Sequence, residues 1–416
     1  MQTNKLIAWF NKQKKINKLK IKKKSYQSLK QWKFDENLIY HKTKNFFSIK
    51  PFLCTQGNIK WFQPLIIQKE QGILGIIKKK IKNKSYYLLQ TKIEPGNING
   101  VQISPTVQAT KSNYLRKHGG KKTIFLDYFL KKKKVKILSN LKLSEQGSRF
   151  LNKKNRNILI EVKKFPTKLK ENFCWLSREN IKYLIGKKNI INMDTISVFS
   201  SVIKKNQFDL PINTKKNLNL RLNKYNRKLI QRRFPAKFKN LKNWKIRNFS
   251  ISDIKKNFFS IFFIDVKANS REVDNWEQPI ISDHYISLNG FLISKINKTT
   301  HYLLKVVNEA GRNQTQFTST IAEKNFTLKF SKKVDYKSFF YKKNYLLDII
   351  NSDEGGRFLK NQTRNIICEI KEYKKIRVKD KFIWASHNQI VELINQNKIT
   401  IEARNLFASY NIDKIT

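Results

Sequence analysis

The chain has 416 residues and carries 87 Lys and Arg against 29 Asp and Glu, a formal charge of +58. This excess predicts a polyanionic partner, above all nucleic acid, although the abundance of Lys, Asn and Ile is also typical of AT-rich coding sequence. No apolar run is long enough to span a membrane. The three cysteines, Cys54, Cys174 and Cys368, lie far apart, which excludes a disulfide framework and argues against a structural zinc site.

Composition and turn signals divide the chain into four segments. Residues 1–50 form a basic N-terminal segment without the pattern of a signal peptide. Residues 51–205 are the first β repeat, 206–275 a basic aromatic spacer, and 276–416 the second β repeat.

The two repeats are detected from the sequence itself. Residues 144–165 and 352–373 align without a gap, and ten of these 22 positions are identical. The similarity continues on both sides, pairing 75–96 with 290–311 and 173–185 with 382–394. A structural unit has therefore been duplicated.

Short β-branched segments between regularly spaced glycine turns favour strands in both repeats. The predicted fold is mainly β, with two tandem small barrel or sandwich modules joined by a basic, partly helical spacer. Residues 181–185 and 390–394 are interpreted as strands, the alternative being the start of a short helix.

The spacer interleaves basic residues with Tyr225, Phe234, Phe238 and Trp244. Cations can neutralise phosphates while aromatic rings stack on bases, and the alternative is a solvated linker whose aromatics pack on the flanking domains. The candidate nucleic-acid-binding residues are Arg221, Lys224, Arg227, Lys228, Arg232, Arg233, Lys237 and Lys239.

A Gly-x-Arg-Phe-Leu box occurs in each repeat, at 147–151 and 355–359, and a Trp follows it. Glycine permits a turn, and Phe and Trp fill a small core. The predicted structural core residues are Gly147, Phe150, Trp175, Gly355, Phe358 and Trp384. The arginines of the boxes, Arg149 and Arg357, either cap this core or face an acidic partner.

Acidic residues give no clear metal site. Asp353 and Glu354 are adjacent, but their counterparts are Glu145 and Gln146 before a glycine, so a turn explains both pairs. Outside the repeats, the only clustered acids are Asp265, Glu272 and Asp274, and no supporting motif accompanies them.

A hydrolase pair is also disfavoured. Ser386 and His387 are adjacent, but the counterpart of His387 is Arg178, so His387 is expected to be a surface residue.

Three segments of the second repeat, HYLLKVVNEAG, LLDIINSDEGGRFL and FIWASHNQIVELI, carry a family resemblance together with their partners in the first. In order and pattern they resemble the sandwich-barrel hybrid modules inserted in the β″ subunit of plastid and cyanobacterial RNA polymerase. The four-cysteine zinc site of that family is not visible in this sequence.

The resemblance implies a non-catalytic insertion region, or split fragment, of a plastid DNA-dependent RNA polymerase. Such a chain would act as a scaffold in DNA-templated transcription, be encoded and located in the chloroplast, and bind the α, β and β′ subunits and DNA or RNA phosphates. It would hold no cofactor of its own, with Mg²⁺ expected only at the active centre on a sister subunit. Whether the chain counts as part of a nucleotidyltransferase stays open.

Two alternatives compete with this interpretation. The first is a stand-alone organellar RNA-binding or ribosome-associated protein, which would use the basic spacer. The second is an intron-borne maturase or endonuclease, which the shortage of acidic residues disfavours.

Overall fold

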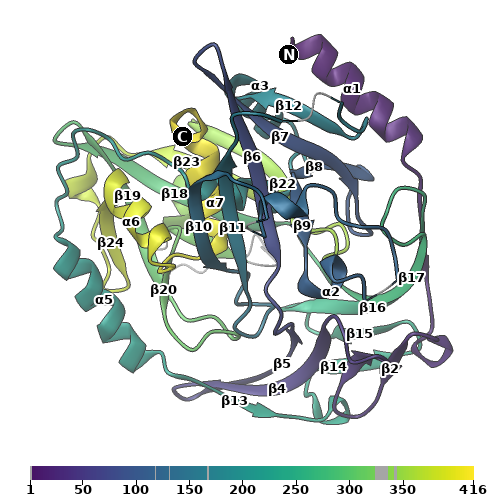
Figure 1. Ribbon diagram of the computed structural model, residues 1–416. Helices are drawn as coiled ribbons and strands as arrows, with labels where there is room; N and C mark the ends of the chain where they lie inside the picture. Colours follow the sequence, from purple (N-terminus) through teal and green to yellow (C-terminus); the bar gives the residue numbers. More distant parts are fainter. Residues whose placement is uncertain (1, 118, 131, 166–167, 324–335, 342–343) are drawn as a thin grey trace.

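The computed structural model describes residues 2–117, 119–130, 132–165, 168–323, 336–341 and 344–416 (Figure 1). Strands dominate this part of the chain, where they form four sheets. The prediction of a mainly β protein is therefore confirmed.

The first large sheet is built from the first repeat and has seven strands. Its main path runs through β10 (Lys136–Ser144), β11 (Lys154–Glu161), β6 (Ile73–Ile81), β7 (Lys84–Ile93) and β12 (Phe173–Ser177). Two short strands, β8 (Val101–Pro105) and β9 (Val107–Ala109), pair with β7 and β6.

The second large sheet repeats this topology strand for strand. Its path runs through β22 (Leu347–Ser352), β23 (Gln362–Glu369), β18 (Ser287–Ile296), β19 (Thr299–Val307) and β24 (Phe382–Ser386). Here β20 (Gln316–Thr318) pairs with β19 and β21 (Ile321–Glu323) with β18. Each sheet contains one parallel pair, β11 with β6 and β23 with β18.

The two smaller sheets exchange strands between the halves of the chain. One contains β13 (Gln231–Pro235), β4 (Ser48–Gln56), β3 (Ile39–His41), β2 (Trp32–Phe34) and β5 (Ile59–Ile67). The other contains β1 (Leu19–Lys23), β16 (Phe259–Ala268), β15 (Ser250–Asp253), β14 (Trp244–Arg247) and β17 (Asn275–Asp283). Residues 206–275 thus supply four strands and the helix α5 (Lys215–Lys228), which lies at the opposite side of the molecule from α1 (Thr3–Ile16) (Figure 1).

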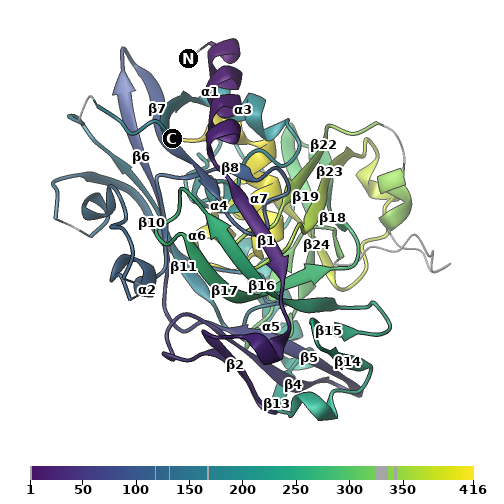
Figure 2. The same cartoon turned by 90° about the vertical axis from the view of Figure 1, so that its right-hand side faces the viewer.

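The described residues do not confirm the expected pair of small barrel or sandwich modules. The outermost strands of each large sheet pair on one side only, so both sheets are open. The helices α4 (Met193–Ser200) and α7 (Ile401–Tyr410) pack against each other at the centre, between the two large sheets (Figure 2). One buried cluster accordingly contains Tyr87 and Phe199 from the first half together with Tyr302 and Phe407 from the second. Because the halves bury their apolar faces against each other, neither needs to close on itself.

The segments 181–185 and 390–394 are helical, and their interpretation as strands was wrong. They belong to α3 (Arg178–Ile185) and α6 (His387–Asn395), each of which starts at a serine N-cap with a reciprocal capping box. Apolar residues at helical spacing then face the core. The remaining short helix is α2 (Lys111–Tyr114). No helix in the described part of the chain is long and apolar enough to cross a membrane.

Candidate active site

Each half of the molecule meets the other at a glycine. At the first contact, which we call the Gly96 joint, the Gly96 N–H donates to the Gly355 carbonyl at 2.7 Å and the Lys360 N–H donates to the Gly96 carbonyl at 2.9 Å. The second contact, the Gly311 joint, mirrors it, because the Gly311 N–H donates to the Gly147 carbonyl at 2.6 Å. The two Gly-x-Arg-Phe-Leu boxes are therefore exchanged, each one docking on the opposite half.

Both joints require glycine for steric reasons. A Cβ atom on Gly96 would lie 1.6 Å from the Phe358 carbonyl oxygen, and one on Gly311 would lie 1.9 Å from the Phe150 carbonyl oxygen. The close backbone approach brings the neighbouring side chains together. At the Gly96 joint these neighbours are Glu94, at the end of β7, and Glu354, which follows β22.

A cavity of about 560 Å³ lies beside the Gly96 joint. Its wall is shared by the N-terminal segment, the first large sheet, the loop between β16 and β17, and the box of the second half. The lining residues divide into a buried inner end that is rich in carboxyl groups and a more exposed outer end that is rich in cations and aromatic rings.

Glu94 occupies the inner end and is held by two cations. Its Oε1 lies 3.2 Å from Lys92 Nζ and 3.5 Å from a guanidinium nitrogen of Arg271. Burial opposes ionisation of Glu94, but the positive charges of Lys92 and Arg271 outweigh it, so its pKa is lowered. Glu94 is therefore a carboxylate at neutral pH.

Glu354 has the opposite protonation preference. Its Oε1 accepts the Gly356 N–H at 2.8 Å, and it shares a hydrogen bond with Glu94. Burial, followed by the negative charge of Glu94, raises the pKa of Glu354 to about 8. The inner end thus places a carboxylate beside a carboxylic acid, an arrangement suited to acid–base chemistry.

Other inner-end residues complete a dense polar wall. Asp194 accepts a hydrogen bond from Gln108 Nε2 at 2.8 Å, and burial together with the charge of Glu145 raises its pKa. Burial lowers the pKa of Lys153 to about 8. Lys153 donates to the Glu70 backbone carbonyl and lines the same cavity.

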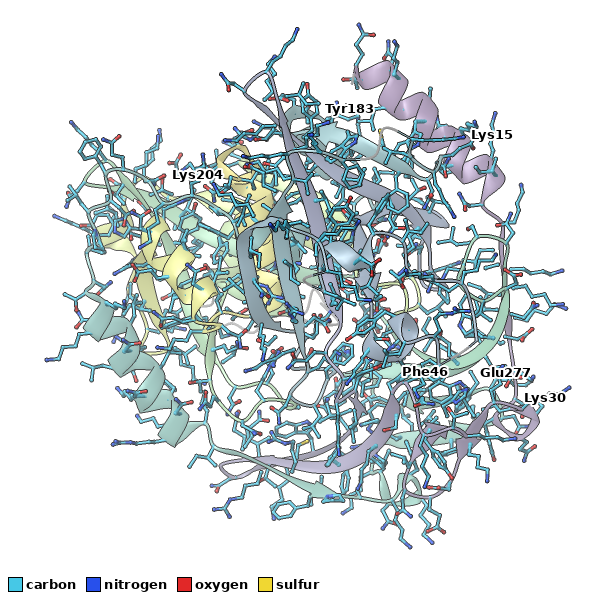
Figure 3. The ribbon with its side chains drawn as sticks, in the orientation of Figure 1. Lys15, Lys30, Phe46, Tyr183, Lys204 and Glu277 are labelled. Atoms are coloured by element: carbon cyan, nitrogen blue, oxygen red, sulfur yellow. The ribbon has the colours of Figure 1, made fainter. Side chains whose placement is uncertain are left out.

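The outer end is formed by the N-terminal segment lying on β17. Glu277 anchors this segment by accepting the backbone N–H groups of Lys30 and Gln31 at 2.8 and 2.9 Å, and its own carbonyl accepts Trp32 Nε1–H at 2.6 Å. Figure 3 shows Lys30, Phe46 and Glu277 in one region of the molecule, away from the labelled Lys15, Tyr183 and Lys204.

Aromatic rings and cations both line this outer end, where Trp32 and Phe47 are buried and Phe46 and Trp276 are half-buried. The Trp32 ring lies 4.8 Å from that of Phe47, and the Arg357 guanidinium lies 4.0 Å from the centre of the Phe47 ring. Lys30 and Lys42 line the cavity with largely exposed side chains. Such a surface can hold a ligand that carries both phosphate groups and a planar ring.

Metal-binding geometry is not evident in the described residues. No group of three or more His, Cys, Asp or Glu side chains there is arranged to hold a metal ion. The expectation that this chain holds no cofactor stays a prediction.

Most of the predicted nucleic-acid-binding residues have partners within the protein. Arg221 and Lys224 each lie 2.9 Å from Asp380, while Lys237 and Lys239 contact Glu36 at 2.9 and 3.0 Å. Arg233 donates to the carbonyls of Ala310 and Arg312. The other three, Arg227, Lys228 and Arg232, have exposed side chains on α5 and β13. The structure does not bring these eight residues together at the cavity.

The predicted core residues fall into three separate clusters. Phe150 and Phe358 meet across the two joints with ring centres 5.9 Å apart, in a cluster shared with the smaller sheets. Trp175 packs on a cluster of the first half, and Trp384 is buried in one of the second half. Gly147 and Gly355 take part in the joints.

Several acidic candidates behave differently from their sequence interpretation. Glu354 was assigned to turn chemistry, and its position across from Glu94 had no signal in the sequence beyond the duplicated box. Glu272 lines the cavity and pairs with Arg271 at 3.3 Å, whereas Asp274 is an exposed side chain 3.9 Å from Lys121. His387 is buried, not at the surface, with Nε2 2.9 Å from the Lys204 carbonyl.

Comparison with known proteins points to one enzyme family. The family model described as NDP-hexose 2,3-dehydratase matches residues 3–202 and 220–410. A dTDP-4-dehydro-6-deoxy-α-D-glucopyranose 2,3-dehydratase of Saccharopolyspora spinosa is 30% identical, covering 98% of this chain and 91% of that protein. Proteins of the same name from Amycolatopsis orientalis and Streptomyces violaceoruber are 29% and 28% identical, covering 99% and 96% of this chain and 90% and 95% of theirs.

These matches overturn the functional expectations drawn from the sequence. The resemblance to RNA polymerase β″, the scaffold role in transcription, and the partnership with α, β and β′ subunits were wrong, and RNA binding gains no support either. A plastid location is contradicted by relatives that are bacterial. The resemblance rested on strand order and a duplicated box, which report a fold element and not an activity.

Proposed function

This chain belongs to the NDP-hexose 2,3-dehydratase family, and on that basis we propose that it removes water from C2 and C3 of a nucleotide-linked 4-keto-hexose in the cavity beside the Gly96 joint. The relatives are named for dTDP-4-dehydro-6-deoxyglucose, which is the substrate to test first.

The chemistry of such a substrate sets clear demands on a site. The C4 carbonyl acidifies the hydrogen on C3, and the hydroxyl on C2 lies β to that carbonyl. Elimination therefore needs a base at C3 and an acid that protonates the C2 hydroxyl as it leaves. The nucleotide must be held so that the hexose is fixed against both groups.

The cavity meets these demands at its two ends. The pair formed by the buried Glu94 and the half-buried Glu354 is the observation that carries the proposal, because it combines a carboxylate and a carboxylic acid in one cavity. At the outer end, Lys30 and Lys42 can contact phosphates while the half-buried Phe46 and Trp276 rings offer aromatic surface. A volume of about 560 Å³ lies within the range that small-ligand sites occupy.

The test is conversion of the keto sugar by the purified chain. Incubation with dTDP-4-dehydro-6-deoxyglucose should yield a product lighter by one water molecule in mass spectrometry. The matched control is dTDP-glucose, which has a hydroxyl at C4 and should remain unchanged. A folded protein that binds dTDP but leaves the keto sugar intact would contradict the proposed function.

A further inference from the structure

We infer that Glu94 is the base that takes the C3 proton and Glu354 is the acid that gives its proton to the departing C2 hydroxyl. This division of roles rests on the proposed function and adds to it the identity of the two catalytic residues.

The positions of the two side chains support this assignment. Glu94 and Glu354 come from opposite halves of the chain, and the hydrogen bonds between Gly96 and the box of the second half hold them at one place in the cavity wall. Both side chains line the cavity within two residues of the Gly96–Gly355 hydrogen bond, and a hydrogen bond joins their carboxyl groups. A rigid backbone joint fixes both side chains far better than a mobile loop would.

Positive charge is distributed unequally around the two carboxyl groups. Lys92 and Arg271 both contact Oε1 of Glu94, whereas Oε2 is buried and lies outside the two ion pairs. Glu354 instead accepts the Gly356 N–H at Oε1 and shares a hydrogen bond with Glu94, and the charge of Arg357 does not offset its burial. The cations thus select Glu94 as the ionised member, and Glu354 keeps the proton that a leaving hydroxyl needs.

The stereochemistry of the substrate also suits this pair. In the gluco configuration the hydrogen on C3 and the hydroxyl on C2 lie on the same face of the ring. One pair of adjacent carboxyl groups on one wall of a cavity can therefore reach both, which is the requirement for a syn elimination.

The proton and electron balance closes within the pair. Glu94 takes the C3 proton, the C–H electrons form the C2=C3 double bond, and the C2–O bond breaks as the oxygen receives the Glu354 proton and leaves as water. The product is an enol at C3 conjugated with the C4 ketone, which tautomerises to a 3,4-diketone. Glu94 is then protonated and Glu354 ionised, and transfer of one proton between the neighbouring carboxyl groups restores the starting state.

The experiment separates proton abstraction from water loss. The keto sugar is incubated in D₂O with wild type, E94Q or E354Q, and deuterium at C3 of the recovered substrate is measured by NMR beside the amount of dehydrated product. We expect E354Q to lose at least about 100-fold in dehydration while still exchanging the C3 hydrogen. E94Q should lose about 100-fold or more in both.

Two controls distinguish a wrong assignment of the residue roles from misfolding of a variant and from failure of the proposed function. Affinity for dTDP, measured by calorimetry, should change less than about threefold in both variants, because the pair faces the sugar and not the nucleotide. Exchange that survives in E94Q, or exchange that disappears in E354Q, overturns the assignment. Absence of dehydration by wild type overturns the proposed function instead.

The wild-type protein gives an independent readout that needs no variant. Dehydration should fall as the pH rises through about 8, since the pKa of Glu354 lies there and its proton is lost. Exchange at C3 should persist above that pH, because it needs only ionised Glu94. A parallel fall of both rates would contradict separate roles for the two residues.

Discussion

The Gly96 and Gly311 joints share one backbone design and differ in the side chains placed on it. Where the first has Glu354, the second has Gln146, and where the first has Asn97, the second has Arg312. The buried Arg312 side chain donates to the backbone carbonyls of Glu145 and Lys153 in the opposite half, whereas the Asn97 side chain donates to the Lys92 and Gly100 carbonyls of its own half. Both joints therefore have the same backbone geometry, but only the Gly96 joint pairs two carboxyl groups.

The arginines of the two boxes show the same contrast. Arg149 is buried in an ion pair with Asp283 at 2.7 Å and lies over the Phe259 ring. Its counterpart Arg357 lines the cavity and lies over the Phe47 ring. The sequence expectation left two roles open for these residues, and the structure places Arg149 within the protein core and Arg357 at the cavity.

The largest effect on stability is expected from replacing either of the two joint glycines, because neither joint has room for a Cβ atom. G96A and G311A should each lower the free energy of unfolding by about 3 kcal/mol or more, because a Cβ atom would overlap a backbone oxygen that cannot move alone. The control is G186A at the end of α3, where the nearest atom would lie 3.5 Å away and the change should stay within about 1 kcal/mol. Urea unfolding measures all three. A G96A protein as stable as G186A would show that the joint is not a rigid contact.

The two joints should differ in activity, because changing the glutamate beside each one should have different effects on kcat. E94Q should reduce kcat for the dehydration by about 100-fold, since the base is lost. E309Q replaces the equivalent glutamate at the Gly311 joint, which accepts the Gly147 N–H at 3.0 Å. A glutamine can still accept that bond, so kcat should change by less than about twofold. Steady-state kinetics on both variants measure the contrast, and equal losses would remove the functional difference between the halves.

Opening the Gly311 joint should affect stability alone. R312A removes the donors for two buried carbonyl groups, and we expect a loss of about 2 kcal/mol in the free energy of unfolding. The kcat of the folded variant should remain near the wild-type value. A drop in kcat comparable to that of E94Q would mean that the Gly311 joint takes part in the reaction.

The smallest effect is expected on the basic surface. R227A and K228A change exposed side chains in the last turn of α5 and should alter stability by no more than about 0.5 kcal/mol. Conversion of the keto sugar should be unaffected by either change. Thermal melts and the dehydration assay check both expectations, and a large loss of turnover would place this helix in the substrate path.

The repeat and the predominance of strands could be predicted from the sequence because both depend on local patterns. A further signal was available in Trp61-x-Gln63-Pro64, which recurs as Trp276-x-Gln278-Pro279. In both copies the indole N–H donates to the glutamine two residues later, at 2.9 and 2.8 Å. This second match would have extended the duplication to the smaller sheets.

The site could not be predicted in the same way because it depends on contact between halves. Nothing near Glu94 in the sequence points to Glu354, and the strand exchange of β1 and β13 follows from burial across the whole molecule. Comparison of the copies also misled, because Gln146 opposite Glu354 in the alignment suggested a turn. The position at which the copies differ, Gln146 in one and Glu354 in the other, is the one that we assign to catalysis.

A crystal structure of the slow variant E94Q with bound dTDP-4-dehydro-6-deoxyglucose would test most directly the assignment of Glu94 as base and Glu354 as acid. We predict that the hexose lies at the inner end of the cavity, with C3 toward residue 94 and the C2 hydroxyl toward Glu354. The diphosphate should lie near Lys30 and Lys42. A hexose bound at another place, or one whose C2 and C3 face away from both residues, would contradict this assignment.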